Sequence, residues 1–274
     1  MAEVHALPVR KFGQTSRTDA WWGPSLITFL VFTGFIIYST WAGYSNAHYE
    51  WGPYLSPMYS PVLFGPSPHS WFGGPEQPAW WPPFLHYSGA ALILIFPLSF
   101  RITCYYYRGA YYKAFWADPP GCAVGEPRQT YWGERKFPLV MQNIHRYALY
   151  FALIFIGILS YDAWKAMWFP ADGSSLLLDG TPTKFGIGVG TLILTANVVF
   201  ISLYTLGCHS LRHLVGGARD VLSGRPVQKT AYRCVSCLNR WHMKWAWISL
   251  VWVGFTDLYV RMLSMGIWHD FRLF

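Results

Sequence analysis

The stretch FGIGVGTLILTANVVFISLYTL, residues 185–206, contains no Asp, Glu, Lys or Arg. A helix of about 20 apolar residues spans the roughly 30 Å of hydrocarbon in a bilayer. Four other segments are comparably long and apolar. The sequence therefore predicts an all-α integral membrane protein, with residues 1–274 forming a single membrane-anchor domain. Its five transmembrane helices are expected at about Pro24–Ala47, Phe84–Thr103, Leu139–Ala163, Phe185–Leu206 and Trp241–Leu263. Pro97 should kink the second.

The composition agrees with a membrane protein. Hydrophobic residues make up 53% of the 274 residues and charged residues 12%, about half the fraction usual in a soluble domain. The 16 Trp suit a protein that must line two membrane–water interfaces. The net charge of +8 comes from basic residues between apolar stretches, so we interpret it as membrane topology and expect no nucleic-acid partner. The first apolar run is too long for a cleavable signal core.

The distribution of Lys and Arg predicts the orientation. One side of the predicted spans carries Arg10, Lys11, Arg17, Arg108, Lys113, Arg128, Arg135, Lys136, Arg212, Arg219, Arg225, Lys229, Arg233 and Arg240. The opposite side carries Lys165, Lys184 and Arg272. Because cytoplasmic loops hold the excess of Lys and Arg, the N-terminus is expected in the cytoplasm and the C-terminus outside the cell membrane.

Most soft and imidazole ligands fall on the predicted cytoplasmic side. They are Cys104, Cys122, His145, Cys208, His209, His213, Cys234, Cys237 and His242. A lone Cys or His at a helix end is more often a buried or interfacial side chain than a ligand. Polar groups within membrane spans are nevertheless costly and tend to mark function. So many ligands at one depth, from four helices and their loops, therefore predict a metal or redox cofactor.

The residues alone leave the cofactor open. Two His on facing helices could hold haem b, for example His145 with His209 or His242. Zinc would accept the same ligands, but its benefit would be structural. A Rieske-type [2Fe–2S] cluster takes two Cys and two His. The Cys-x-His and Cys-x-x-His pattern usual in soluble Rieske proteins is absent here, so spacing does not select among these cofactors.

Five motifs between residues 101 and 243 resemble one family. They are RITCYYYRGAYY (101–112), PPGCAVGEPR (119–128), QNIHRY (142–147), GCHSLRHLVGG (207–217) and LNRWHM (238–243). Their order and content are similar to the membrane-anchor subunit of actinobacterial, or type F, succinate dehydrogenase, which is respiratory complex II. Cys234 and Cys237 lie outside these motifs and are weaker ligand candidates.

The resemblance implies a function. Such an anchor binds a flavoprotein subunit and an iron–sulfur subunit at its cytoplasmic face, carries a Rieske-type [2Fe–2S] cluster, and passes electrons from succinate to membrane quinone. No nucleotide-binding fingerprint occurs, so the dehydrogenase active site is expected on another chain. The loops Asp118–Phe137 and Ser210–Arg240 carry nine Lys and Arg and are the expected docking platform for the iron–sulfur subunit.

Two ligand sets remain open within this interpretation. The preferred set takes one residue from each of four predicted helices: Cys104, His145, Cys208 and His242. It leaves His209 and His213 for proton delivery to quinone. The competing set is Cys122, Cys208, His209 and His213. Quinone contacts are expected at the inner interface, with Tyr106, Arg108 and Trp241 as candidates, although most aromatic side chains there only form an interfacial belt.

Three other functions compete with this one. A haem b anchor of the same enzyme class would differ only in its cofactor. A membrane transporter would need acidic or His residues near the membrane midplane and paired broken helices, for which the spans offer only Pro97, Asp162 and Asp257. In a purely structural anchor, the Cys and His residues would be inert.

Overall fold

The computed structural model describes residues 11–127, 136–137, 139–171, 181–217, 219 and 221–274. Contacts divide the chain into two compact units. The first unit consists of Met1–Ile36 and Arg101–Ile144, and the second consists of Ile37–Phe100 and His145–Phe274. Arg10, Arg128 and Arg135, which contribute to the predicted charge asymmetry, lie outside the described residues, as does part of the predicted docking loop Asp118–Phe137.

The described residues are mostly helical, as predicted. Four helices are long and apolar enough to cross a membrane: α1 (Gly23–Tyr44), α4 (His145–Lys165), α5 (Val189–Leu206) and α8 (His242–Ser264). A fifth span results if α2 (Gly89–Ile102) and α3 (Tyr105–Phe115) are taken together as one broken span. Among the described residues the number of candidate spans is therefore four or five.

The α-helices of three predicted spans begin later than expected, and the fourth of the five spans has its α5 start at Val189 instead of Phe185. The second starts at Gly89, because the Ser88 hydroxyl accepts a hydrogen bond from the Ala91 amide at 3.0 Å, the contact that starts a helix. Its helix runs through Pro97, and the interruption falls at Thr103 and Cys104 instead. The third begins with a 3₁₀ segment, η1 (Leu139–Ile144), before α4 starts at His145.

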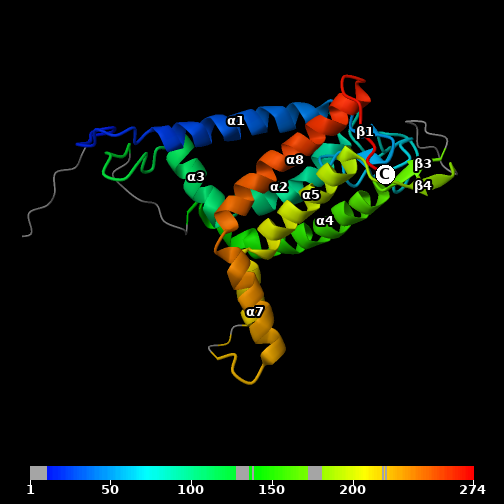
Figure 1. Cartoon of the computed structure of the whole chain (residues 1–274). Helices are drawn as coiled ribbons and strands as arrows, with labels where there is room; N and C mark the ends of the chain where they lie inside the picture. The colour runs from blue at the N-terminus through cyan, green and yellow to red at the C-terminus, as the bar shows by residue number, and fades with distance from the viewer. Residues whose placement is uncertain (1–10, 128–135, 138, 172–180, 218, 220) are drawn as a thin grey trace, which may run out of the picture. The chain divides into compact units, whose positions relative to one another are not determined.

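The second unit is built around α4, α5 and α8, which lie side by side (Figure 1). Beyond one end of this bundle, α6 (His209–Gly216) pairs with α7 (Pro226–Asn239), and α7 projects away from the bundle. The Asn239 amide fastens the base of this helical hairpin by donating to the Gly207 carbonyl at 2.8 Å. The result is a short helical extension at the end where α5 stops and α8 starts.

Two small hairpins cover the opposite end of the bundle. One pairs β1 (Glu50–Trp51) with β2 (Tyr54–Leu55), and the other pairs β3 (Trp168–Pro170) with β4 (Thr183–Phe185). Tyr54 is fully buried there, in a cluster with Phe169, Ile193 and Leu263. A Cβ at position 190 would lie 2.4 Å from the Tyr54 ring, so the start of α5 can pass this ring only as glycine.

Carboxylates near that end are paired. In α8, Asp257 accepts from the Arg261 guanidinium at 2.8 Å, from the Tyr38 hydroxyl at 2.6 Å, and from the Ser56 hydroxyl. The remaining Arg261 nitrogens donate to the carbonyls of Ala42 and Ala47, both at 2.7 Å. Because these partners lie at the end of α1 and in the loop after it, the buried pair fastens that loop to α8.

The first unit packs the N-terminal arm against the loop that holds Cys122. The amide of Gly13 donates to the Gly125 carbonyl at 3.0 Å, and the amide of Gly125 donates to the Gln14 carbonyl at 2.9 Å. The Arg17 guanidinium, itself paired with Asp19, donates to the Cys122 carbonyl at 3.0 Å. The Cys122 loop is therefore held by residues more than 100 positions earlier in the chain.

Candidate functional site

The most direct contact between predicted ligands joins His145 and Cys208. The Nε2 atom of His145 lies 3.1 Å from the Sγ atom of Cys208. His145 is the first residue of α4, and Cys208 is the N-cap of α6, directly after α5. Both residues are buried, and the thiol sulfur also accepts from the Ser210 amide at 3.3 Å. The structure thus places one imidazole and one thiol from separate helices at hydrogen-bonding distance.

Aromatic rings connect this pair to a third predicted ligand. The His145 ring stacks on Phe100, with centroids 4.6 Å apart and planes at 12°. Phe100 meets Tyr204 edge-on at 5.4 Å, and Tyr204 stacks on His242 at 4.9 Å. His242 is 1% exposed, and Tyr204 is also buried. Three of the four residues in the preferred ligand set therefore belong to one buried cluster in the second unit.

Phe100 and Tyr204 are the residues of this cluster that the sequence analysis missed. Each lies four positions before a predicted ligand, Phe100 before Cys104 and Tyr204 before Cys208. Residues four apart lie on the same face of a continuous helix, so an aromatic side chain at that spacing was the available signal. The signal is weak in this chain, because 19% of its residues are aromatic.

The other predicted ligands lie elsewhere. Cys104 and Cys122 belong to the first unit, where Cys104 is buried as the N-cap of α3 and Cys122 is exposed. On α6, the Nε2 atoms of His209 and His213 are 3.0 Å apart, and both side chains are exposed. Partial burial, followed by the charges of His213 and Arg212, lowers the pKa of His209. Cys234 and Cys237 are exposed on α7.

The donor chemistry fits part of an iron–sulfur site. One imidazole and one thiol in contact are the ligand types that a Rieske-type cluster takes, and His242 adds a second buried imidazole. Among the described residues, no three or more His, Cys, Asp or Glu side chains gather closely enough to hold a metal ion. Within the second unit, the described side chains therefore provide a pair of adjoining ligands and no complete set.

The chain is similar to known proteins over most of its length. Residues 24–266 match the family model described as actinobacterial succinate dehydrogenase subunit SdhC. A solved structure titled "Mycobacterium smegmatis Sdh1 complex in the apo form" contains a chain that is 39% identical, with a TM-score of 0.82. The match covers 95% of this chain and 94% of that one. No curated protein matches the chain.

The chain belongs to the actinobacterial SdhC family. The resemblance drawn from the five motifs is confirmed. As a member of the SdhC family, the chain is a membrane-anchor subunit of succinate dehydrogenase, and its apolar helices agree with a multi-pass membrane protein. The predicted enzyme class, a subunit of a succinate-oxidising complex, is confirmed with it.

The quinone candidates of this SdhC chain lie in both units. In the first, the Arg108 guanidinium donates to the Gln142 side chain at 2.8 Å and lies 4.8 Å from the Tyr105 ring centroid. Tyr106 is partly exposed on the same helix, α3. In the second unit, Trp241 directly precedes α8 and is 47% exposed. The Lys244 ammonium lies 4.2 Å from the centroid of its ring. These three residues remain predictions.

Proposed function

We propose that this SdhC chain carries electrons from the soluble subunits of succinate dehydrogenase to membrane quinone through a cofactor held at one end of its helical bundle. The observation that carries the proposal is the buried contact between His145 and Cys208, with His242 in the same aromatic cluster. Family membership supports the role, because the chain is the membrane anchor of this enzyme.

The proposed topology has five spans, with α2 and α3 counted as one, in a single anchor domain. The N-terminus lies in the cytoplasm and the C-terminus outside. The predicted excess of Lys and Arg supports this orientation. It directs α6 and α7 toward the cytoplasm, where the connector Ser210–Arg240 and the loop Asp118–Phe137 would meet the iron–sulfur subunit, with the flavoprotein subunit beyond it.

The proposed cofactor is a Rieske-type [2Fe–2S] cluster with His145, His242, Cys208 and Cys104 as ligands. The His145–Cys208 contact and the burial of all four side chains support this set. Bound there, the cluster would supply one-electron chemistry. The competing set is less well supported, because the Nε2 atoms of His209 and His213 contact each other and the imidazole in contact with the Cys208 thiol is His145.

The protein's own contribution is positioning and exclusion of water. Stacking on Phe100 fixes the plane of the His145 ring, and stacking on Tyr204 fixes that of His242. The rings of Phe100 and Tyr204 also lower the local dielectric constant, which influences the reduction potential of a bound redox group. Quinone reduction would need donors at the two carbonyl oxygens, for which we propose Tyr106, Arg108 and Trp241.

Ligand substitution in the assembled complex tests the cofactor. Changing His145 and His242 together to Ala should remove the cluster's electron paramagnetic resonance signal, its iron, and succinate–quinone activity. The matched control is His209→Ala with His213→Ala, which should keep both the iron and the signal. Normal iron content in an intact His145/His242 variant would show the ligand set to be wrong. A low-spin haem signal from the wild-type complex would show that the cofactor is haem b and not the cluster.

Labelling in membrane vesicles tests the orientation. Cys234 and Cys237 are exposed on α7, so once the soluble subunits have been released from the membrane, an impermeant maleimide should reach them in inside-out vesicles and spare them in right-side-out vesicles. His48→Cys, combined with Cys234→Ser and Cys237→Ser, provides the control. With Cys122→Ser also introduced, because Cys122 is exposed on the predicted cytoplasmic side, this variant has its exposed thiol in the loop after α1 and should react only in right-side-out vesicles. The reversed pattern would contradict the topology.

A further inference from the structure

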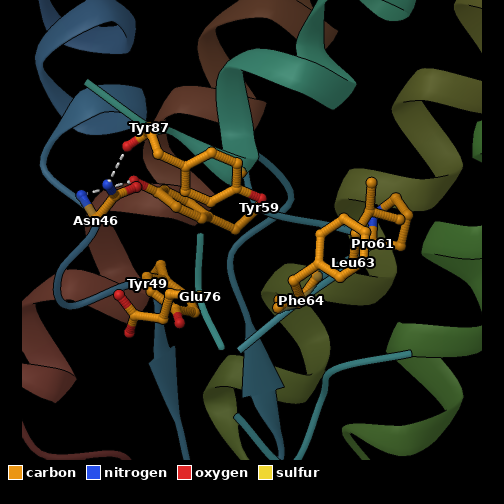
Figure 2. Close-up of a pocket in the computed structure, with 10 residues that line it drawn as sticks. Asn46, Tyr49, Tyr59, Pro61, Leu63, Phe64, Glu76 and Tyr87 are labelled. Carbon is orange, nitrogen blue, oxygen red and sulfur yellow. Dashed lines mark hydrogen bonds between the residues drawn. The ribbon is translucent and has the colours of Figure 1, made fainter. Parts of the chain in front are cut away.

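A pocket lies in the second unit at the end of the bundle opposite His145 and Cys208 (Figure 2). Its empty space, which includes open solvent at the mouth, is about 400 Å³. The loop that forms much of its wall is fastened to the far end of α4, where the Ser60 hydroxyl donates to Asp162. The rest of the lining comes from Glu76 and from Tyr87 and Gly89 near the start of α2.

Four of the ten residues that line the pocket are aromatic, and three of them are tyrosines whose contacts hold them in place. Tyr49 and Tyr59 stack with centroids 4.3 Å apart and planes at 11°, and Figure 2 shows the Tyr87 ring next to Tyr59. The Tyr59 hydroxyl donates to the Ala42 carbonyl at 2.9 Å. Asn46 links two of these residues, since its amide N–H donates to the Tyr59 hydroxyl and its side chain donates to the Tyr87 carbonyl at 2.7 Å.

One negative charge stands beside these rings. Glu76 is the single ionisable acid or base, tyrosines aside, among the ten described residues that line the pocket, and its side chain is exposed. Burial, followed by the charges of Glu50 and Glu76, raises the pKa of Tyr49 above its usual range, and burial followed by Glu76 does the same for Tyr87. The negative charge of Glu76 therefore acts on both Tyr49 and Tyr87.

In the proposed topology, the pocket lies near the level of the lipid head groups. It is lined by Asn46, two residues after α1 ends, and by Gly89, where α2 begins. Exposed aromatic side chains surround this level, including Tyr44, Trp80 and Phe84, as in the belts that mark a membrane–water interface. A ligand here would meet lipid head groups at high local concentration.

We propose that this pocket binds the ammonium group of a zwitterionic lipid. Several aromatic rings beside a carboxylate are the arrangement that recognises organic ammonium ions, because the negative ring faces and the carboxylate attract the same cation. The lining offers no Lys or Arg that would repel it or prefer an anion. The phosphate of such a lipid would remain at the open mouth. This inference does not depend on the proposed electron-transfer role.

Native mass spectrometry of the delipidated complex tests the site. Dihexanoyl phosphatidylethanolamine should bind, ethanolamine alone should bind more weakly, and dihexanoyl phosphatidylglycerol should not bind at this site. Glu76→Gln should weaken phosphatidylethanolamine binding roughly fivefold, since the loss of an exposed carboxylate removes about 1 kcal/mol of attraction. Glu126→Gln, an exposed acid of the first unit, is the matched charge control and should leave binding unchanged.

A second variant separates binding from folding. Tyr49→Leu removes one ring of the stacked pair, so it should weaken phosphatidylethanolamine binding even if it also lowers the melting temperature. Glu76 is exposed, so its substitution should preserve both folding and succinate–quinone activity. Equal binding of the two lipids, or unchanged binding by an intact Glu76→Gln complex, would overturn the proposal. Stronger binding of free ethanolamine than of the lipid would overturn the lipid as the source of the amine.

Discussion

The two ends of the α4–α5–α8 bundle bury polar side chains in different ways. At the Arg261 end, carboxylates meet hydroxyls and a guanidinium: Asp257 binds Arg261, Tyr38 and Ser56, and Asp162 binds Ser60. At the His145 end, imidazoles meet a thiol and aromatic faces. The first pattern satisfies charge and fastens loops. The second brings together groups that ligate metals. Substitutions should therefore affect stability at one end and electron transfer at the other.

The largest expected effect comes from breaking the Asp257–Arg261 pair. Arg261→Leu leaves the Asp257 carboxylate buried without its cation, which typically costs about 3–5 kcal/mol. We expect loss of assembled complex, measured as the yield and melting temperature of the purified enzyme. Asp257→Asn with Arg261→Met, which removes both charges, should recover part of the loss. A normal melting temperature for Arg261→Leu would contradict the structural role of this end.

Low pH should destabilise the Arg261 end of the bundle through the protonation of His69. This residue is 5% exposed, and its Nε2 lies 3.1 Å from the Gly52 carbonyl oxygen. Burial, and then the charge of Lys165, lowers its pKa from 6.5 to about 4. As the pH falls, His69 takes up a proton in the unfolded chain before it does so in the folded protein. The folded state therefore keeps its full stability above pH 6.5. This stability should fall by up to about 3 kcal/mol as the pH drops toward 4.

Melting curves of the complex at pH 7 and pH 4.5 measure this loss. In His69→Gln the difference between the two pH values should shrink, because the titrating group is gone. His48→Gln, a change at an exposed histidine of the same unit, should keep the wild-type difference. Equal pH dependence in the wild type and His69→Gln would contradict the role assigned to His69.

A smaller effect is expected at Asp270. This carboxylate accepts from the hydroxyls of Tyr54 and Tyr259 at 2.6 and 2.8 Å, and from the Gly190 amide at 3.0 Å. Tyr54→Phe removes one donor to a charged group, so it should destabilise the complex by about 1–3 kcal/mol and leave quinone reduction unchanged. A double-mutant cycle with Tyr259→Phe would give the coupling between the two hydroxyls. Additive losses would contradict a shared network.

The smallest stability effect should come from the opposite end. Phe100→Leu removes the ring that stacks on His145, a contact worth about 0.5–1.5 kcal/mol. We expect a small shift in melting temperature with a clear change in the redox midpoint potential. Phe151→Leu removes an exposed ring of α4 and provides the control. If both variants leave the potential unchanged, the aromatic cluster has no part in tuning the site.

The sequence predicted the helices well where charge and hydropathy change abruptly. The fifth predicted span, Trp241–Leu263, differs from α8 by one residue at each end. The sequence did not predict features that local hydrogen bonds decide: Ser88 delays the start of α2, and residues 139–144 form a 3₁₀ segment at the start of the third span, which runs over Val140–Lys165. Hydropathy cannot register such contacts, because they depend on backbone geometry and not on composition.

The candidate site was predicted only in part for a related reason. The sequence predicts the ligand types and a cytoplasmic position for them, and the contact between His145 and Cys208 agrees with the preferred set. The stacking partners Phe100 and Tyr204 were missed, because an aromatic residue within an apolar helix resembles any lipid-facing side chain. Which rings face the interior depends on how each helix is rotated about its axis. These spans have low amphipathicity, so the sequence does not reveal that rotation.

The close passage of α5 over Tyr54 has an evolutionary consequence. A Cβ at Gly190 would overlap the Tyr54 ring at 2.4 Å, and one at Gly188 would lie 2.3 Å from an Asp270 oxygen. Neither glycine can acquire a side chain while the tyrosine and the carboxylate remain. These four positions, scattered over more than 200 residues, should therefore be inherited as a unit. In lineages that lose the tyrosine, Gly190 would be free to vary, whereas Gly188 would still be constrained by the Asp270 carboxylate.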